Sequence, residues 1–165
     1  MNSEELFDVV DEEDQVLERL PRSVVHERGL MHRSVHVFVF NTEGLLLIHL
    51  RSADKDEYPS LWTSSASGHV SAGESYDDAA PRELAEELGL HEPLTRLAKF
   101  PASEQTAREF TMLYELMTDT PPEFDQAEIE RIEFRDPLEL LHDLRRDPES
   151  FSPPFRLLLD WYCRR

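Results

Sequence analysis

The stretch "GHVSAGESYDDAAPRELAEELGL", residues 68–90, decides the fold expected for this chain, because it reads as a glycine-bearing loop followed by a helix. Ser75 followed by Asp78 resembles a capping box, and Gly89 is a suitable C-terminal stop, so the helix is predicted between them. Pro81 interrupts this pattern, because it lacks a backbone N–H and clashes with the preceding turn. We therefore expect the helix to kink at Pro81 or to begin near Asp78 or the residue before it.

The predicted helix carries negative charges at an informative spacing. Glu83, Glu86 and Glu87 stand at positions i, i+3 and i+4, so their side chains share one helix face about one turn tall. Like charges this close repel one another unless a cation lies among them, and Mg²⁺ is held in proteins by a few carboxylates together with substrate phosphates. We interpret this face as a metal-binding edge. If only the nine residues "RELAEELGL" (82–90) are considered, an ordinary solvated helix face is the alternative to a metal-binding edge.

Composition limits the possible classes of function. With 165 residues, of which 39% are hydrophobic, the chain suits one compact domain with its own core. The formal net charge of −18 repels polyanions and argues against binding to nucleic acid polymers or anionic membranes. A phosphate-bearing substrate would therefore need bridging cations. The lone cysteine, Cys163, excludes an intrachain disulfide and a cysteine-based zinc cluster.

The sequence also bears on where the protein is found. No apolar run approaches the roughly 18 residues of a membrane-spanning helix. The N-terminal stretch "MNSEELFDVVDEEDQ" is acidic, where a secretion signal is basic and then apolar. We expect a cytoplasmic protein.

Strands and helices are predicted in mixed order along the chain. An N-terminal hairpin extension is expected at about residues 5–20, followed by a short helix closed by Gly29. Alternating or continuous apolar runs predict further strands at residues 34–41, 45–52, 94–100, 109–117 and 128–134, and helices at residues 137–146 and 152–165. The fold class is therefore α/β.

The spacing of the opening stretch is more specific than its charge. It matches the pattern G-x5-E-x7-R-E-U-x-E-E-x-G-U at Gly68, Glu74, Arg82, Glu83, Glu86, Glu87 and Gly89, with Leu84 and Leu90 as the bulky apolar residues U. This pattern resembles the Nudix box, the signature of the Nudix hydrolase superfamily. The resemblance implies an α/β/α sandwich with a mixed sheet, formed by residues 1–165 as a single domain, in which the box is a loop, a helix and a loop.

The resemblance also implies metal-dependent attack of water on a diphosphate linked to another group. Glu83, Glu86 and Glu87 would bind Mg²⁺, with Mn²⁺ as a substitute, and the backbone carbonyl of Gly68 would add a ligand. Such a metal can neutralise the diphosphate and lower the pKa of bound water. The resemblance leaves the number of metal ions open.

Other site residues follow from the same resemblance. One of the box glutamates or Glu109 would position or deprotonate the water, and which of them does so is open. Glu74 and Arg82 would brace the helix by ion pairing.

The chain resembles one branch of this superfamily over nearly its whole length. Residues 9–62 and the C-terminal "FSPPFRLLLDWYCRR" look like the type 1 isopentenyl-diphosphate isomerases and their relatives. In that branch, residues matching Arg51 and Lys55 contact substrate phosphates; the alternative is that both are loop cations without a ligand. Tyr58, Trp62 and Phe110 could stack on a base, or could simply pack within a loop or the core.

Comparison with the isomerase itself shows a mixture of matches and departures. Ser67 stands where the isomerase has a cysteine, and a hydroxyl does not easily replace a thiol in proton transfer to or from carbon. His32 and His69 match histidines of the isomerase metal site, and His26 does so approximately; whether they bind metal is left open. Ala107, two residues before Glu109, leaves one expected glutamate missing.

We therefore predict a metal-dependent hydrolase that cleaves the diphosphate linkage of nucleoside di- or triphosphates or related nucleoside diphosphate derivatives. The alternatives are an isopentenyl-diphosphate isomerase and a non-catalytic Nudix binding module. The intact box disfavours the module, and the missing cysteine disfavours the isomerase. The substrate expected is a small diphosphate compound, and its identity and the oligomeric state are not decided by the sequence.

Overall fold

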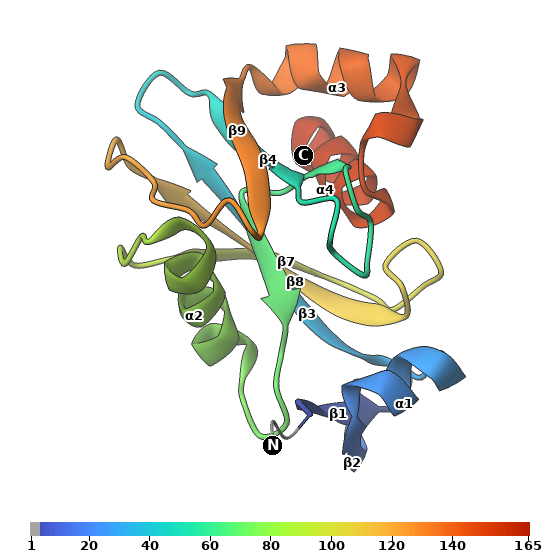
Figure 1. Cartoon of the computed structure of the whole chain (residues 1–165). Helices are drawn as coiled ribbons and strands as arrows, with labels where there is room; N and C mark the ends of the chain where they lie inside the picture. Colours follow the sequence, from blue (N-terminus) through green and yellow to red (C-terminus); the bar gives the residue numbers. More distant parts are fainter. Residues whose placement is uncertain (1–3) are drawn as a thin grey trace.

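The structure is a computed structural model that describes residues 4–165 (Figure 1). The strands are β1 (Leu6–Val10), β2 (Val16–Pro21), β3 (His32–Phe40), β4 (Leu46–Arg51), β5 (Trp62–Thr63), β6 (Ala66–His69), β7 (Thr95–Phe100), β8 (Glu109–Met117) and β9 (Ile129–Arg135). The helices are α1 (Arg22–Arg28), α2 (Tyr76–Leu88), α3 (Pro137–Arg146) and α4 (Pro153–Arg164), with a 3-10 turn at Pro148–Ser150. No helix among residues 4–165 combines the length and the apolar character needed to cross a membrane.

The main sheet contains parallel and antiparallel strands, and two of its neighbouring strands, β3 and β4, separate to form a cleft. It has seven strands in the order β5-β4-β3-β8-β7, with β6 paired to β3 and β9 paired to β4. Strands β3 and β8 are parallel over their whole length, and the other pairs are antiparallel. The ladder between β3 and β4 is limited to Phe40 and Leu46. Farther along β3, at residues 34–37, its partner is β6 instead, so β3 and β4 separate and leave a space between them.

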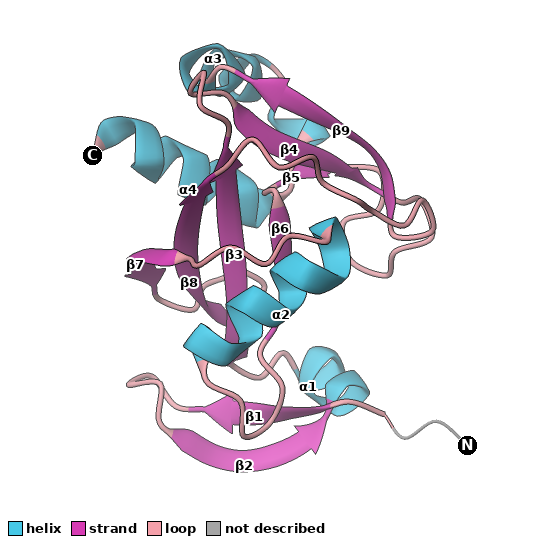
Figure 2. Ribbon diagram, turned by 90° about the vertical axis from the view of Figure 1, so that its left-hand side faces the viewer, coloured by secondary structure: helices cyan, strands magenta, loops and turns pink. Residues whose placement is uncertain are grey.

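Helices cover both faces of this sheet (Figure 2). The alternation of side chains along β3 divides the buried residues into two clusters. The valines of β3 pack against α2 in a cluster that includes Val35, Val37, Val39, Leu84 and Leu88. The phenylalanines of β3 pack against α3 and α4 in a cluster that includes Phe38, Phe40, Leu140, Phe155 and Leu159. This arrangement confirms the predicted α/β/α sandwich with a mixed sheet.

The helix predicted from the opening stretch is present, and its start is more regular than expected. Ser75 Oγ accepts a hydrogen bond from the Asp78 backbone N–H at 3.1 Å, and Gly89 ends the helix with a positive φ of 65°. Helix α2 begins at Tyr76 and continues through Pro81, rather than beginning one or two residues later. Pro81 is exposed and removes one backbone hydrogen bond, and the burial of apolar side chains elsewhere on the helix, such as Leu84, offsets that loss.

The N-terminal hairpin forms a separate two-stranded sheet, as predicted, and is tied to the main sheet by a buried carboxylate. Asp14, in the turn between β1 and β2, receives hydrogen bonds from Arg33 Nε at 2.7 Å, Tyr76 Oη at 2.7 Å and Lys99 Nζ at 2.6 Å. Several charged hydrogen bonds to one buried carboxylate compensate for its removal from water. The hydrogen bonds to Asp14 hold the hairpin, and the helix α1 that follows it, beside one end of the cleft.

The loop predicted around Gly68 is wrong in one respect. Residues 66–69 form strand β6, whose short ladder pairs Gly68 with Val35 and Ser67 with His36. A segment this short, rich in serine and glycine, carries no periodic signal of a strand. Its conformation depends on the neighbouring strand β3.

Candidate functional site

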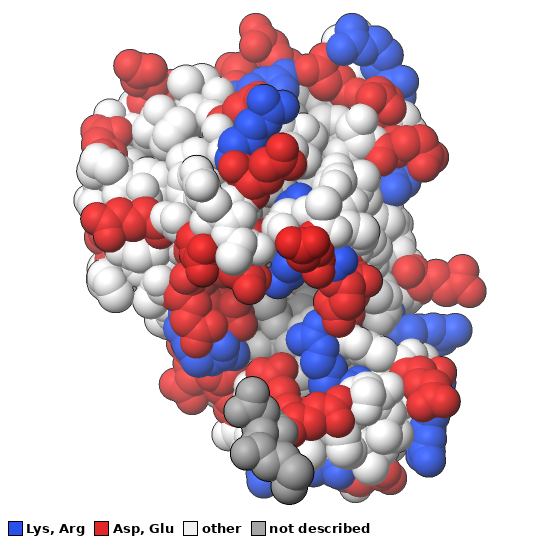
Figure 3. Space-filling view, viewed as in Figure 1, with Lys and Arg blue, Asp and Glu red and all other residues white. Residues whose placement is uncertain are grey.

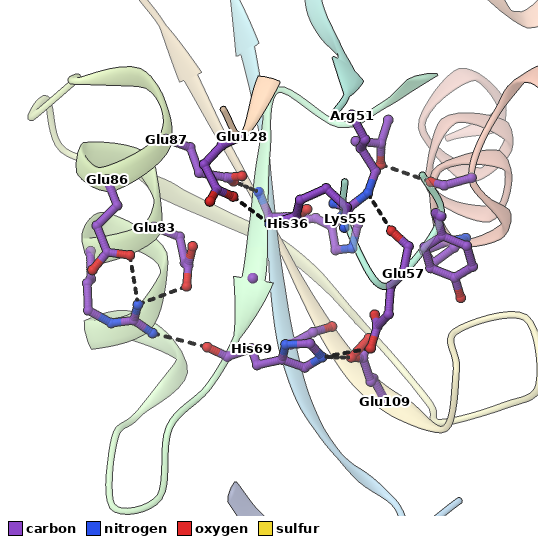
Figure 4. A pocket seen from close by; sticks show the side chains of 18 of the residues that line it. His36, Arg51, Lys55, Glu57, His69, Glu83, Glu86, Glu87, Glu109 and Glu128 are labelled. Carbon is purple, nitrogen blue, oxygen red and sulfur yellow. Dashed lines mark hydrogen bonds and ion pairs between the residues drawn. The ribbon is translucent and has the colours of Figure 1, made fainter. Parts of the chain in front are cut away.

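A cavity of about 400 Å³ lies between the α2 side of the cleft and the β4 side. Its lining includes residues from α2, β3, β4, β6, β8 and the loop between β4 and β5. Figure 4 shows the box glutamates on one side, basic side chains on the other, and His69 with Glu109 at one end. The predicted site residues Arg51, Lys55, Tyr58, Gly68, Arg82, Glu83, Glu86, Glu87 and Glu109 all line this cavity.

Two of the box glutamates are fitted closely against strand β6. The Ser67 backbone N–H donates to Glu87 Oε1 at 2.6 Å. A Cβ atom on Gly68 would lie 2.1 Å from Glu83 Cδ, so only a glycine leaves room for the Glu83 carboxylate in this position. The glycine requirement is therefore a matter of space beside the strand rather than of a special backbone angle.

Burial disfavours the charged forms of the Glu83 and Glu87 carboxylates. Withdrawal from water, followed by the nearby Glu83 carboxylate, raises the pKa of Glu87 to about 8, although the Ser67 N–H, Arg51 and Lys55 act in the opposite direction. Withdrawal from water also raises the pKa of Glu83 to about 7. A cation bound between the two side chains would stabilise their charged forms, because an opposite charge favours ionisation. Oxygen ligands of this kind suit Mg²⁺ or Mn²⁺.

Arg82 forms an ion pair with Glu74 and also contacts Glu83 and Glu86. Its guanidinium donates to Glu74 at 2.7 Å, to the His69 carbonyl oxygen at 3.0 Å and to Glu83 Oε1 at 2.8 Å. It also lies 3.3 Å from a carboxylate oxygen of Glu86, whose side chain is 58% exposed. Arg82 thus joins α2 to strand β6 and orients Glu83, while Glu86 remains the most accessible of the box glutamates.

Arg51 and Lys55 form a basic side of the cavity in an otherwise acidic protein. Lys55 Nζ lies 2.6 Å from Glu128 Oε2, and Arg51 Nε donates to the backbone carbonyl of Glu57 at 2.9 Å. Figure 3 shows acidic side chains over much of this face, with basic ones between them. The remaining donors of Arg51 and Lys55 can bind an anion, and their charge opposes the repulsion expected from a net charge of −18.

A second cluster of possible metal ligands adjoins one end of the cavity, where Glu57, His69 and Glu109 belong to the lining. His26, His32 and His69 come from α1, β3 and β6, yet one ring nitrogen of each lies within 4.8 Å of those of the other two. Glu109 Oε2 lies 2.9 Å from His69 Nε2 and 3.3 Å from His32 Nε2, and Glu57 Oε1 lies 3.1 Å from His26 Nε2. The three Nε2 atoms and Glu109 Oε2 are buried and make no well-aligned hydrogen bond with any described residue.

The electrostatics of this cluster follow from its mixture of imidazoles and carboxylates. Burial alone would raise the pKa of Glu109, but His69 and His32 outweigh it and hold that pKa well below its usual range. Burial alone would lower the pKa of His69, but Glu109 and then Glu57 raise it above its ordinary value. Imidazole nitrogens combined with carboxylates are the ligands that Zn²⁺, Mn²⁺ or Fe²⁺ accept. The cluster can hold such a metal, or can form buried ion pairs without one.

Glu57 is the member of this cluster that sequence reasoning missed. It lies in the loop between β4 and β5, and no motif or spacing connects it with the histidines. In space its Oε1 atom lies 3.1 Å from His26 Nε2 and 3.7 Å from His69 Nε2, on the same side of the His69 ring as the Glu109 carboxylate. Ala107 carries no carboxylate, and Glu57 supplies one to the cluster from a different part of the chain.

The aromatic residues predicted to contact a substrate are separated by the structure. Tyr58 lines the cavity, with a positive φ of 49° in the loop after β4. Trp62, on β5, and Phe110 both lie outside the lining, and Phe110 packs beside Lys99, whose Nζ is 5.4 Å from the ring centroid. Phe110 lies outside the cavity because side chains alternate along strand β8. Glu109 and Thr111 share one face of the sheet, and Phe110 points to the other.

Comparisons with known proteins agree with this description. A family model for the NUDIX domain matches residues 30–155. An uncharacterized Nudix hydrolase from Pseudomonas aeruginosa is 37% identical over 160 residues, covering 94% of each chain. An isopentenyl-diphosphate Delta-isomerase from Serratia proteamaculans is 30% identical over 161 residues, covering 94% of this chain and 90% of the relative. The crystal structure of DR0079 from Deinococcus radiodurans has a TM-score of 0.84 at 29% identity and covers 94% of this chain and 98% of that one.

Proposed function

The chain belongs to the Nudix family, and we propose that it is a Mg²⁺-dependent hydrolase that cleaves the diphosphate linkage of a nucleoside di- or triphosphate or a related nucleoside diphosphate derivative. One observation carries this proposal. Glu83 and Glu87 lie on one side of the cavity, and Arg51 and Lys55 lie on the other. A diphosphate bound between these sides would meet metal ligands on one side and positive charge on the other.

The box residues fit the metal that the family implies. Glu83, Glu87 and the Gly68 carbonyl would hold it, with Glu86 at the exposed end of the same helix face. Bound Mg²⁺ would neutralise the diphosphate and lower the pKa of a coordinated water. Arg82 keeps Glu83 in place, and Arg51 and Lys55 would orient the phosphates from the other side.

The contacts of Glu109 favour a box glutamate as the residue that positions or deprotonates the water. Two imidazoles hold the Glu109 carboxylate, and its lowered pKa makes it a poor proton acceptor. The Glu87 carboxylate accepts one backbone N–H, and the Glu86 side chain is 58% exposed, so neither is held by imidazoles as Glu109 is. We assign the role to Glu86 or Glu87, and we assign Glu109 to the histidine cluster.

A second candidate function is isopentenyl-diphosphate isomerisation, and the histidine cluster is the observation that favours it. Isomerisation needs a proton added to one carbon and removed from another, by groups on opposite faces of the substrate. Ser67 lines the cavity where the isomerase has its cysteine, and its hydroxyl is poorly suited to exchange protons with carbon. Cys163, the only thiol of the chain, lies in the last turn of α4. We therefore rank hydrolysis first.

A direct assay separates these functions. The purified protein is incubated with Mg²⁺ or Mn²⁺ and a panel of nucleoside di- and triphosphates, sugar nucleotides and dinucleotides, and release of phosphate or nucleoside monophosphate is measured. In parallel, it is incubated with isopentenyl diphosphate in deuterated water. We expect turnover of at least one nucleotide and no deuterium in the carbon skeleton. Deuterium entering at a catalytic rate would refute the proposal and support the isomerase.

A further inference from the structure

The floor of the cavity is polar where strand β3 passes beneath it. Along one face of β3, His32, Ser34 and His36 are followed by Phe38 and Phe40. The two phenylalanines lie in the buried cluster beneath α4, whereas Ser34 and His36 line the cavity. The same face of one strand thus changes from apolar to polar where the cavity begins.

Two polar groups on this floor are free to bind a ligand. His36 and Ser67 are direct partners in the ladder between β3 and β6, so their side chains lie next to each other on the same face. The His36 Nδ1 atom is 2.7 Å from Ser64 Oγ. Within residues 4–165, no protein group forms a hydrogen bond with His36 Nε2 or with the Ser67 hydroxyl. Figure 4 shows His36 between the box glutamates and the basic side chains.

The hydroxyl groups around this pair already have partners. Ser34 Oγ lies 3.1 Å from Thr111 Oγ1, and Thr63 Oγ1 lies 2.9 Å from Ser152 Oγ. These pairs leave His36 and Ser67 as the unpaired polar groups of the floor. The cavity offers little apolar surface there, since Tyr58 and Pro154 are the lining residues with mainly apolar side chains.

The imidazole of His36 can both donate and accept a hydrogen bond. Burial lowers its pKa to about 4, so the ring is neutral near pH 7, with one N–H and one unprotonated nitrogen. A ligand hydroxyl can donate or accept and therefore matches either tautomer. A hydrocarbon would leave both His36 Nε2 and the Ser67 hydroxyl without water or a partner, which is unfavourable for buried polar groups.

We propose that His36 and Ser67 bind a hydroxyl group on the part of the substrate that is joined to the diphosphate, so that the cavity selects a sugar-bearing diphosphate over a hydrocarbon-bearing one. This inference rests on the proposed function for the placement of the diphosphate between Glu87 and Arg51. A site built to bind a substrate hydroxyl rejects an analogue that lacks it, because the polar groups of the site are then left unpaired. His36 and Ser67 thus become residues that determine specificity.

Binding of analogues that cannot be hydrolysed tests this inference without requiring turnover. Two methylene-bridged diphosphonates are compared by calorimetry in the presence of Mg²⁺, one carrying ribose and the other an isopentenyl group. For the unchanged protein we expect the ribose analogue to bind at least about tenfold more tightly. His36→Phe, which keeps a flat ring of similar size, should remove most of this preference. Ser67→Ala, which removes a hydroxyl with no described protein partner, should reduce it about threefold or more.

A matched control is His49→Phe. His49 is also buried with a pKa lowered to about 4, but it lies on β4, bonds the Ser65 carbonyl oxygen and does not line the cavity. We expect this variant to keep the ribose preference. If His36→Phe fails to fold, Ser67→Ala still gives the decisive comparison, because the hydroxyl it removes forms no hydrogen bond with any residue in 4–165.

The outcomes separate this inference from the proposed function. Equal binding of both analogues, no measurable binding of either at millimolar concentration, or an unchanged preference in both His36→Phe and Ser67→Ala would overturn the inference. A protein that hydrolyses nucleotides but binds the two analogues equally would refute only the role of His36 and Ser67. A protein that prefers the ribose analogue but hydrolyses no nucleotide would refute only the proposed function.

Discussion

The cavity combines two groups of candidate metal ligands that are built in different ways. The carboxylates of α2 come from one helix turn, and their separation is set by the helix repeat. The histidine cluster takes one ligand each from α1, β3, β6, β8 and the loop after β4. The first group consists of oxygen donors and suits Mg²⁺, whereas the second includes three imidazoles and suits a transition metal. The difference indicates that the two ends of the cavity have different chemistry.

The largest effect is expected from removing one charge from the α2 carboxylates. Glu87→Gln or Glu83→Gln should lower kcat by about a hundredfold or more, because each removes a ligand charge while keeping the shape of the side chain. Hydrolysis of the best nucleotide found by the panel assay is the measurement. Glu43→Gln, in the exposed turn after β3, is the control and should have no effect. Full activity in both variants would show that the α2 carboxylates are not the metal-binding edge.

A smaller effect is expected from Gly68→Ala, which tests the fit between β6 and α2. The added Cβ would lie 2.1 Å from Glu83 Cδ, and the flexible carboxylate can move aside. Activity should fall about tenfold to a hundredfold, since a small displacement of a ligand is costly in catalysis. The melting temperature should change little, because Gly68 does not have a positive φ. Unchanged activity would contradict the assigned position of Glu83.

Metal binding by the histidine cluster can be tested with Co²⁺, whose visible absorption depends on its ligands. Co²⁺ should bind to it with a visible absorption typical of nitrogen ligation, and the absorption should be lost in His69→Gln. Glu57→Gln should weaken this binding about tenfold, because a carboxylate beside the imidazoles is removed. Glu128→Gln changes a carboxylate that contacts Lys55 instead and serves as the control. A Co²⁺ spectrum that shows no nitrogen ligation would indicate that the histidine cluster forms buried ion pairs and does not bind metal.

The smallest effect is a dependence of stability on pH. Burial raises the pKa of Glu87 in the folded protein to about 8, well above its value in an unfolded chain, so the folded protein holds more protons than the unfolded chain between these two values. The free energy of unfolding should therefore fall as pH rises from 6.5 to 8 without metal, by about 1 kcal/mol. Glu83 and His69 have raised pKa values and act in the same direction.

Thermal unfolding at several pH values measures this effect. Added Mg²⁺ should raise the melting temperature more at pH 8 than at pH 6.5, because a metal that binds only the folded protein stabilises it and competes with protons for the carboxylates. Glu87→Gln should flatten the pH dependence in the absence of metal. A melting temperature that rises with pH in the unchanged protein without metal would contradict the raised pKa values.

Local sequence signals explain why several elements could be predicted. The bounds of α2 follow from the Ser75 cap and from Gly89, and the strands at residues 109–117 and 128–134 follow from apolar runs. Strand β6 could not be predicted, because its hydrogen bonds depend on pairing with β3 rather than on its own four residues. The location of Phe110 outside the cavity depends on which face of β8 turns toward the cleft, and the sequence does not reveal that orientation.

The sequence by itself determined the family and the trio of glutamates, because these depend on residue spacing within one short segment. Only the tertiary structure decided that Glu57 stands beside His26, and that His36 and Ser67 share the floor of the cavity. The physical reason is that contacts between distant segments arise from strand pairing and packing. No periodicity along the chain predicts these contacts, because they depend on how the segments are arranged in three dimensions.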